Sequence, residues 1–396
     1  MTDQPLKPGW RRYRFDQMAV NVNERVEPGE TDAAYYVGLE HLDTDSLKIR
    51  RWGTPDDVEA TKLRFHKGDI IFGRRRVYQR KLAVADFDGI CSAHAMVLRA
   101  RPDVVLPEFL PFFMQSDLFM NQALEISVGS LSPTINWRTL AAQEFPLPPP
   151  DEQRRLVEVL WAIEEAIVAA QVLGQKTDAL RKASLIDVFS QLENDADVKW
   201  VAVASVGDVL MGRQRAPQYD KGISPRPYLR VANVYDGYID TTDVKEMDFS
   251  DAEFEQYRLQ PGDILLNEGQ SRELTGRSAI YFNEVTDCCF QNTLIRFRPR
   301  RISSAYAHRY FQHCLYSGRF IAISKQTTSI AHLGVTRFAQ MRFPFVEEKR
   351  QAKITDTFAI YDQGIKAASQ RVKRNQQLKR FILDYELSKH GELTHS

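Results

Sequence analysis

The sequence predicts a mixed α/β (α+β) chain with two pseudo-repeated domains. Each domain is followed by a long helix, and the two helices are expected to pack as an antiparallel coiled coil. Three observations lead to this prediction. The chain has 396 residues, which is more than one hydrophobic core usually supports. It matches itself at an offset of about 192 to 198 residues, and each repeat ends in a long stretch with coiled-coil spacing.

The internal repeat gives the order of the elements within each half. The matching segments are 35–43 with 228–236, 66–74 with 259–269, 91–102 with 289–299, and 129–156 with 327–354. Short apolar runs between turn residues predict strands. These runs are 70–72, 82–84 and 95–99 in the first half, and 228–231, 264–266 and 293–297 in the second. One amphipathic helical stretch is expected in each half, at 109–124 and 306–323.

A long helical stretch closes each repeat, directly after a Phe-Pro segment. Apolar residues recur there at alternating steps of four and three, the spacing of a seam buried against another helix. The two sets, related by an offset of 198, are Leu156, Leu160, Ile163 and Ile167, and Ile354, Phe358, Tyr361 and Ile365. We favour mutual packing of the helices over the alternative that each helix only covers its own domain. The expected boundaries are 1–149 and 195–345 for the domains, with helical regions at 150–194 and 346–396.

The composition is that of a globular protein, with 43% apolar and 27% charged residues. Lysine and arginine total 53 against 52 acidic residues, so net charge alone does not indicate a polyanionic partner. No window approaches the roughly 18 apolar residues of a membrane span, so we expect a cytoplasmic protein without membrane contact. The four cysteines lack the spacing of a disulfide framework or zinc site, and we expect them to be buried thiols.

The segment that enters the first long helix carries the most specific motif. Residues 146–154 read PLPPPDEQR, which resembles the P-L-P-P-x-x-E-Q-R segment of the specificity subunits of type I restriction-modification systems. The resemblance extends over nearly the whole chain, because the blocks around residues 69–99 and 228–240 also resemble recurring blocks of that family. The second copy, at 344–351, departs from the motif and keeps only Pro344 and Gln351, which correspond to Pro146 and Gln153.

The resemblance implies a non-catalytic subunit that recognises a bipartite, asymmetric site in double-stranded DNA, with one half-site for each domain. It also implies two methyltransferase subunits as partners and, in the full complex, two restriction/translocase subunits. The geometry expected from the residues is compatible with this role. Two similar but non-identical domains held apart by a helix of about 35 residues, roughly 50 Å long, would read two half-sites at a fixed distance.

The motifs of the obvious enzyme classes are missing from the sequence. There is no Asn-Pro-Pro-aromatic segment for methyl transfer, no G-x-G-x-x-G and no phosphate-binding G-x-x-x-x-G-K-[ST]. The carboxylates of residues 56–62 are better explained as a solvated loop than as a nuclease site, because they have Glu-x-x-Lys rather than Glu-x-Lys spacing. The histidines lack zinc-site spacing. We therefore expect no catalysis, no cofactor and no metal.

DNA contacts are expected where arginine is mixed with amides, hydroxyls and glycine, because phosphate contacts position a protein and base-edge contacts specify sequence. Two equivalent segments have this character. One follows the predicted strand that begins after Gly68-Asp69, and the other follows the strand that begins after Gly262-Asp263. Three further segments have the same mixture of residues less strongly. The candidates are Arg74, Arg75, Arg76, Tyr78, Arg80 and Lys81 in the first segment, Gln270, Arg272, Thr275 and Arg277 in the second, and Arg213, Arg215, Asn233, Lys325 and Thr327 elsewhere. Small hydroxyl residues at 127–132 and 325–329 belong to the weaker group.

Two alternatives remain open from the sequence. A charged loop can simply solvate a turn, and for any single candidate this is about as plausible as DNA contact. The chain as a whole could also be a duplicated scaffold that binds proteins and does not read DNA. Salt dependence separates the two functions, since only binding to phosphates weakens steeply as salt rises.

Overall fold

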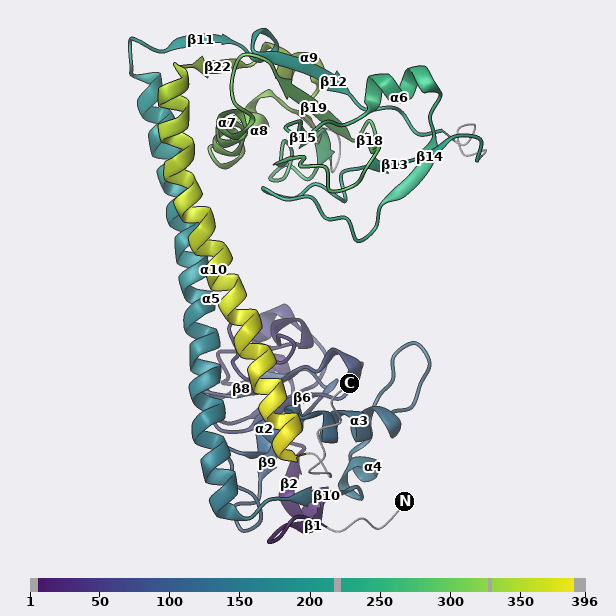
Figure 1. The fold of residues 1–396 in the computed structure, drawn as a ribbon. Helices are drawn as coiled ribbons and strands as arrows, with labels where there is room; N and C mark the ends of the chain where they lie inside the picture. Colours follow the sequence, from purple (N-terminus) through teal and green to yellow (C-terminus); the bar gives the residue numbers. More distant parts are fainter. Residues whose placement is uncertain (1–5, 217–221, 327–329, 388–396) are drawn as a thin grey trace. The chain divides into compact units, whose positions relative to one another are not determined.

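The computed structural model describes residues 6–216, 222–326 and 330–387 (Figure 1). The chain divides into two compact units. Unit 1 comprises residues 1–172 and 368–396, and unit 2 comprises residues 173–367. Each unit therefore contains one α/β domain and segments of both long helices. Among the described helices, none combines the length and apolarity that crossing a bilayer would require.

The domain of unit 1 is built around a four-stranded antiparallel sheet with the strand order β2-β9-β6-β7. These strands are Ala19–Val22, Ala95–Ala100, Ile70–Gly73 and Leu82–Val84. Side chains alternate across the sheet. Ile70 and Phe72 enter a large aromatic core, whereas Ile71 enters a smaller core on the opposite face. Because both faces are buried, these strands read in sequence as continuous apolar runs.

Two further sheets and four short helices complete this domain. One sheet has the order β3-β5-β8-β4 and the other pairs β1 with β10. Their bounds are Arg25–Val26, Lys62–Phe65, Gly89–Cys91, Tyr36–Val37, Arg11–Arg14 and Glu144–Leu147. The helices are α1 (Phe15–Met18), α2 (Leu110–Gln115), α3 (Asp117–Glu125) and α4 (Trp137–Ala141).

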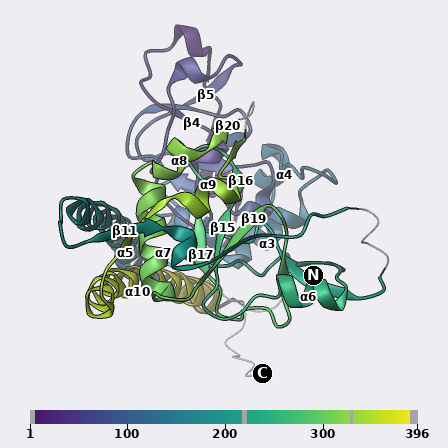
Figure 2. The same cartoon turned by 90° about the horizontal axis from the view of Figure 1, so that it is seen from above.

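The domain of unit 2 repeats this arrangement. Its main sheet has the order β12-β19-β15-β17, which matches β2-β9-β6-β7 strand for strand. These strands are Gly207–Met211, Leu294–Pro299, Ile264–Asn267 and Ser278–Ile280. The remaining sheets are β14-β13-β18 (Lys245–Asp248, Pro225–Leu229, Cys289–Phe290), β11-β22 (Lys199–Ala202, Arg342–Phe345) and β16-β21-β20 (Gly269–Gln270, Ala331–His332, Lys325–Gln326). The helices are α6 (Asp251–Tyr257), α7 (Ser304–Tyr316), α8 (Arg319–Ile323) and α9 (Val335–Gln340), and the view in Figure 2 shows the domain from above.

The repeated Gly-Asp pair is a structural feature of each main sheet. Gly68 and Gly262 have φ values of +92° and +96°, which residues with a Cβ rarely adopt. The buried carboxylate that follows each glycine accepts a backbone N–H from the same turn and pairs with an arginine on the neighbouring strand. The nearest oxygen–guanidinium distances are 2.7 Å for Asp69 with Arg99 and 2.7 Å for Asp263 with Arg298.

Each of the two predicted amphipathic helical stretches is broken into two helices. In the first, Ser116 ends α2 and begins α3, where its hydroxyl accepts a hydrogen bond from the Phe119 N–H at 3.3 Å. In the second, Gly318 has a φ of +75° between α7 and α8. The single continuous helices expected from the periodicity are therefore wrong at these positions.

The two long helices are α5 (Pro150–Glu193) and α10 (Glu348–Leu387). They run side by side in opposite directions, because contacting residue numbers fall along α10 as they rise along α5 (Figure 1). The predicted two-domain architecture with an antiparallel helix pair is thus confirmed. Both helices are longer than the 35 residues expected, with 44 and 40 residues.

Seam residues contact both the partner helix and a domain. Leu156 and Leu160 lie in the core of unit 1 together with Leu383 and Leu387 of α10. Ile354 and Phe358 lie in the core of unit 2 together with residues of α5, and Tyr361 packs against that core. Ile163 and Ile167 are buried, and Ile365 is partly buried. Helix pairing and coverage of the domains are therefore compatible features of the same seam.

One shared feature of the two helix entries explains why a glutamine is present in the divergent second copy of the motif. The Gln153 amide donates to Pro148 O at 2.9 Å and accepts from Leu106 N at 2.9 Å. The Gln351 amide donates to Val346 O at 2.9 Å and accepts from Ser303 N at 3.0 Å. Each glutamine therefore ties the first turn of a long helix to its own domain.

Candidate nucleic-acid interface

In unit 1 the structure brings together two segments that the sequence singled out. Residues 74–76 follow β6 directly, and Arg75 forms an isolated β-bridge with Thr134. The Arg76 N–H donates to Pro133 O at 2.8 Å, and the Ile135 N–H donates to Arg74 O at 3.0 Å. The hydroxyl-rich turn around 128–134 therefore lies against the arginine segment and supports it.

The guanidinium groups of this segment have few acidic partners. Arg75 and Arg76 are exposed, and among the described residues neither has a carboxylate within ion-pair distance. The Arg76 Nε donates to Ser132 Oγ at 3.3 Å, and an Arg75 nitrogen lies 3.5 Å from His94 Nε2. Burial lowers the pKa of His94, and the charges of Arg75 and Arg74 lower it further. This edge of the domain is therefore cationic and suited to an anionic ligand.

A cavity of about 310 Å³, lined by both polar and apolar side chains, lies beside this edge. Its lining includes Asn21, Asn23, Arg25, Lys62 and Arg74. The Arg74 Nε is buried and has no hydrogen-bond partner among the described residues. Amide and guanidinium groups are those that pair with the edges of adenine and guanine. Sequence reasoning missed the first four residues, because they come from strands remote from the arginine segment and carry no local pattern.

In unit 2 the equivalent segment follows β15 and forms a small three-stranded sheet. Gly269 and Gln270 of β16 pair with His332 and Ala331 of β21, which also pairs with β20. This arrangement corresponds to the Arg75–Thr134 bridge of unit 1. The Glu268 carboxylate lies 3.0 Å from His332 Nδ1. The two domains therefore present chemically different surfaces at the same place in a shared fold.

Several candidates of unit 2 remain accessible to a ligand, although no contact with one is observed. The side chains of Arg215, Arg272 and Lys325 are exposed, and that of Gln270 is half-buried. The Arg277 guanidinium lies over the Tyr235 ring at 4.5 Å. Tyr78 of unit 1 is also exposed. Thr327 lies outside the described residues.

Other candidates are engaged in contacts inside the protein. The Arg80 guanidinium pairs with Asp45 at 2.7 Å and with Asp117 at 2.8 Å, and the Lys81 ammonium donates to Leu39 O at 2.6 Å. These cations hold the base of the loop because acceptors from distant segments surround them.

In unit 2 three candidates are likewise engaged within their own domain. The Arg213 guanidinium is buried, pairs with Glu253 at 2.8 Å and lies over the Phe249 ring. The Asn233 amide donates to Asp240 O at 2.9 Å and so shapes a turn. The Thr275 hydroxyl is buried and bonds to Ser271 O at 3.0 Å. Each side chain satisfies the backbone or a charge of its own domain rather than facing solvent.

The comparisons with known proteins agree with this arrangement. Residues 56–172 match the family model described as the type I restriction modification DNA specificity domain. This stretch is therefore similar to that domain family. The resemblance to type I specificity subunits, first suggested by residues 146–154, is thereby confirmed. The match covers the α/β domain of unit 1 from residue 56 onward, its arginine segment and the first half of α5.

Two curated relatives and one solved structure extend the comparison. The chain is 29% identical over 163 residues to the EcoDI specificity subunit of Escherichia coli, covering 40% of this chain and 36% of that protein. It is 23% identical over 198 residues to the EcoKI specificity subunit of Escherichia coli strain K12, covering 44% and 40%. The chain thus matches about two fifths of the length of these relatives.

The chain is also similar to a structure from work on complex assembly and conformational transition of the type I R-M system. The match covers 98% of this chain and 100% of the chain in that structure. Its TM-score is 0.61 and its sequence identity is 23%, so it supports the fold of both α/β domains and the helix pair.

Proposed function

We propose that this chain is the DNA sequence-specificity subunit of a type I restriction-modification complex. Each domain would recognise one half of a bipartite, asymmetric site. The observation that carries this proposal is the pair of equivalent edges after β6 and β15, which share a backbone arrangement but differ in their side chains. A duplicated fold with different side chains at one edge is suited to two different half-sites.

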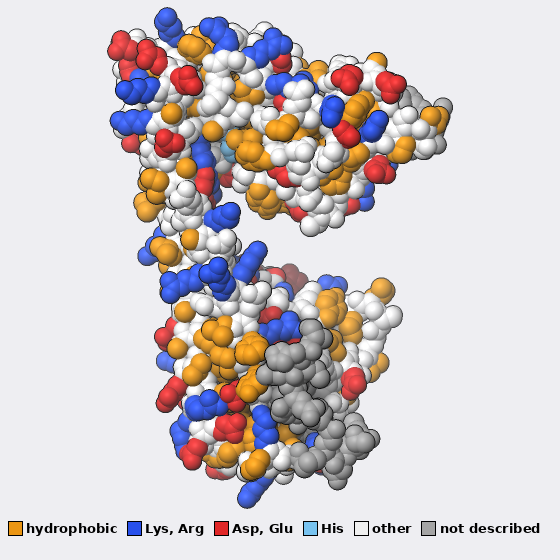
Figure 3. Space-filling model, in the orientation of Figure 1, with side chains coloured by type: hydrophobic (Ala, Val, Ile, Leu, Met, Phe, Trp, Pro, Cys, Tyr) orange, Lys and Arg blue, Asp and Glu red, His pale blue; other side chains and the backbone are white. Residues whose placement is uncertain are grey.

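In this proposal the chain supplies recognition and not catalysis. Methyl transfer would come from two methyltransferase subunits, and cleavage from two restriction/translocase subunits. An apolar groove on the helix pair of unit 1 is a suitable place for a methyltransferase subunit to dock. It is lined by α5 and α10 residues that include Val159, Ala162, Leu378 and Ile382. Figure 3 shows hydrophobic side chains reaching the surface over the α10 end of unit 1.

The recognition chemistry at the edge of unit 1 would combine two kinds of contact. Arg75 and Arg76 are exposed cations on the rim and would contact phosphates. Asn21, Asn23 and Arg74 line the neighbouring cavity and would meet base edges, where amides select adenine and guanidinium selects guanine.

Selection from a random duplex DNA library, followed by binding assays at several salt concentrations, tests this proposal. We expect a split motif and an affinity that falls steeply with salt, because each phosphate contact releases counterions. A salt-independent affinity, or no sequence enrichment, would instead favour a protein-binding scaffold.

Substitution of the two exposed arginines tests the edge itself. We expect Arg75→Ala and Arg76→Ala each to weaken binding to the selected DNA and to lower the logarithmic salt slope by about 1, as the loss of one phosphate contact does. Arg154→Ala, which removes an exposed arginine from the first turn of α5, is the matched control and should change neither quantity. Unchanged binding by both edge variants would contradict the assignment.

A further inference from the structure

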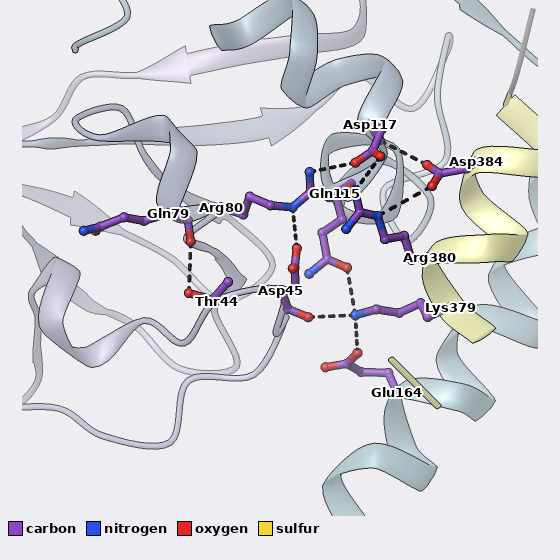
Figure 4. A network of polar contacts seen from close by, with 10 residues as sticks. All are labelled: Thr44, Asp45, Gln79, Arg80, Gln115, Asp117, Glu164, Lys379, Arg380 and Asp384. Carbon is purple, nitrogen blue, oxygen red and sulfur yellow. Dashed lines mark hydrogen bonds and ion pairs between the residues drawn. The ribbon is translucent and has the colours of Figure 1, made fainter. Parts of the chain in front are cut away.

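A buried cation in unit 1 joins three parts of the structure. The Lys379 ammonium, on α10, donates to Glu164 Oε2 of α5 at 2.8 Å (Figure 4). It also donates to Asp45 O at 2.8 Å and to Gln115 Oε1 at 3.1 Å, both in the domain. The Lys379 and Glu164 side chains are only 4% and 1% exposed. We call this cluster junction 1.

Unit 2 contains a second cluster of the same kind around Arg181 of α5, which we call junction 2. The Arg181 side chain is 8% exposed and lies 3.8 Å from an Asp362 oxygen of α10. Its guanidinium donates to the Tyr316 hydroxyl at 3.1 Å and pairs with Asp178 at 2.7 Å. A carboxylate oxygen of Asp236 lies 3.9 Å away.

The two junctions are equivalent positions of the internal repeat. Asp362 lies 198 residues after Glu164, and Lys379 lies 198 residues after Arg181. The helices exchange roles, since α10 carries the cation in junction 1 and α5 carries it in junction 2. This exchange follows from the antiparallel packing, in which Glu164 of α5 meets Lys379 of α10 and Arg181 of α5 meets Asp362 of α10.

The domain side of each junction also corresponds. Gln115 is the last residue of α2, and Tyr316 is the last residue of α7. Asp45 lies in the loop after β4 and Asp236 in the loop after the equivalent strand β13, although the repeat aligns Asp236 with Asp43. In both junctions the cation of one helix therefore meets a carboxylate of the other helix, an oxygen from the end of a domain helix, and an oxygen from the loop after β4 or β13.

Junction 1 continues to the base of the candidate DNA-contacting segment. Asp117 accepts a hydrogen bond from Arg380 of α10 at 2.7 Å, and its other oxygen accepts one from Arg80 at 2.8 Å. Burial acts to raise the pKa of Asp117, but Arg380 and Arg80 outweigh it and hold the pKa below its usual value. Asp117 therefore bridges two arginines as a carboxylate. Through it, Arg380 of α10 is connected to Arg80 in the segment that follows β6 (Figure 4).

A buried ion pair is a poor source of stability, because desolvation offsets most of its attraction, but it can specify one geometry over its alternatives. We propose that the two junctions are positioning elements for half-site spacing. Each one fixes the rotational setting of its domain on the helix pair, and together they restrict the DNA spacer to one length. This inference rests on the proposed function.

The geometry of DNA explains why rotation matters. With roughly 10.5 base pairs per turn, one added base pair turns the second half-site by about 35° and moves it by about 3.4 Å. A domain must follow this rotation to accept the longer spacer. Contacts of 2.8 to 3.1 Å from one ammonium group to three separate elements do not survive such a movement together.

The test uses the full chain and duplex DNA in which the two selected half-sites are separated by a series of spacers. The Glu164→Gln/Lys379→Met variant removes both charges but keeps a side-chain carbonyl at position 164 to accept the Leu47 N–H. We expect the ratio of binding at the optimal spacer to binding at spacers one base pair longer or shorter to fall by about tenfold. The melting temperature is measured alongside, because loss of the Lys379 ammonium leaves Asp45 O and Gln115 Oε1 without this donor and should lower stability, whereas the spacer ratio reports positioning.

The matched control removes an exposed ion pair between the same two helices. Arg155 and Glu386 lie 3.0 Å apart and are 58% and 21% exposed, so Arg155→Met/Glu386→Gln should leave the spacer ratio unchanged. Lys379→Arg recreates the chemistry of junction 2 and should keep the wild-type ratio. An unchanged ratio in the Glu164→Gln/Lys379→Met variant would overturn the inference, even if its melting temperature fell.

Two further outcomes are distinguishable. If the double variant does not fold, Arg181→Lys supplies the test in unit 2, because it keeps the charge but cannot reach Asp178, Tyr316 and Asp362 together. A lowered spacer ratio supports the inference and an unchanged one overturns it. If the wild-type chain selects no split site, the proposed function itself fails, whatever the variants do.

Discussion

Two buried histidines make the stability of unit 2 sensitive to pH. Burial lowers the pKa of His308 to about 4 and that of His313 to about 4. His308 Nε2 bonds to Ser278 O at 3.0 Å, whereas both His313 ring nitrogens are buried without a hydrogen-bond partner among the described residues. His313 instead packs against Phe189 and Tyr310. Both rings are therefore neutral in the folded state at neutral pH.

The sign of the pH dependence follows from these shifts. Because the folded pKa lies below the ordinary value of about 6.5, the unfolded state binds more protons, and stability falls as pH decreases from about 6.5 towards 4. Each histidine should cost about 2 kcal/mol between pH 7 and pH 5. We expect His313→Phe to remove roughly half of this dependence in urea unfolding of the full chain. The same slope in the variant and the wild type would show that His313 does not carry it.

For single residues, the sequence predicts which side chains are cationic but not which partners they contact in the fold. Arg75 and Arg80 belong to the same basic segment, yet one is exposed and the other is held by Asp45 and Asp117. The partners of Arg80 lie 35 and 37 residues away in sequence, so no local pattern could separate the two arginines. The hydroxyl-rich segment around 128–134 was predictable as a companion only because the same pair of segments occurs twice.

The long helices are the elements that the sequence predicted best, whereas β2, β12 and β17 of the main sheets were not predicted. Helix periodicity and the offset of 198 residues depend on many side chains at once, so no single exception obscures them. The breaks at Ser116 and Gly318 were missed because each depends on one residue that caps or reverses the backbone. The cavity beside the arginine edge was also missed, since separate strands contribute to it.

The two helix entries should be equally important for stability. Gln153 and Gln351 make the same pair of hydrogen bonds, although the motif around the second has diverged. We expect Gln153→Ala and Gln351→Ala each to lower the free energy of unfolding by about 1 to 3 kcal/mol, because each leaves a buried N–H and a buried C=O unpaired. Urea denaturation measures both. A clear effect of Gln153→Ala with none of Gln351→Ala would mean that the entries are not equivalent.

The whole molecule combines a shared helix pair with two domains that differ at one edge. If the helices set the spacing of the half-sites, their length between the two junctions should matter directly. Deleting residues 171–174 and 369–372 removes four residues from each helix and leaves both junctions intact. At 1.5 Å per residue this shortens the helices by about 6 Å, so we expect a spacer shorter by roughly 2 base pairs. An unchanged spacer would show that the helices do not set it.

The central claim, that one chain recognises a split DNA site through two domains, is tested most directly by mapping methylated sites. The chain would be co-expressed with a candidate methyltransferase, and the methylated positions compared with those obtained when the chain is omitted. The account predicts methylation that depends on the chain, at two short specified sequences separated by an unspecified spacer of fixed length. A continuous, unsplit motif, or the same methylation without the chain, would contradict it.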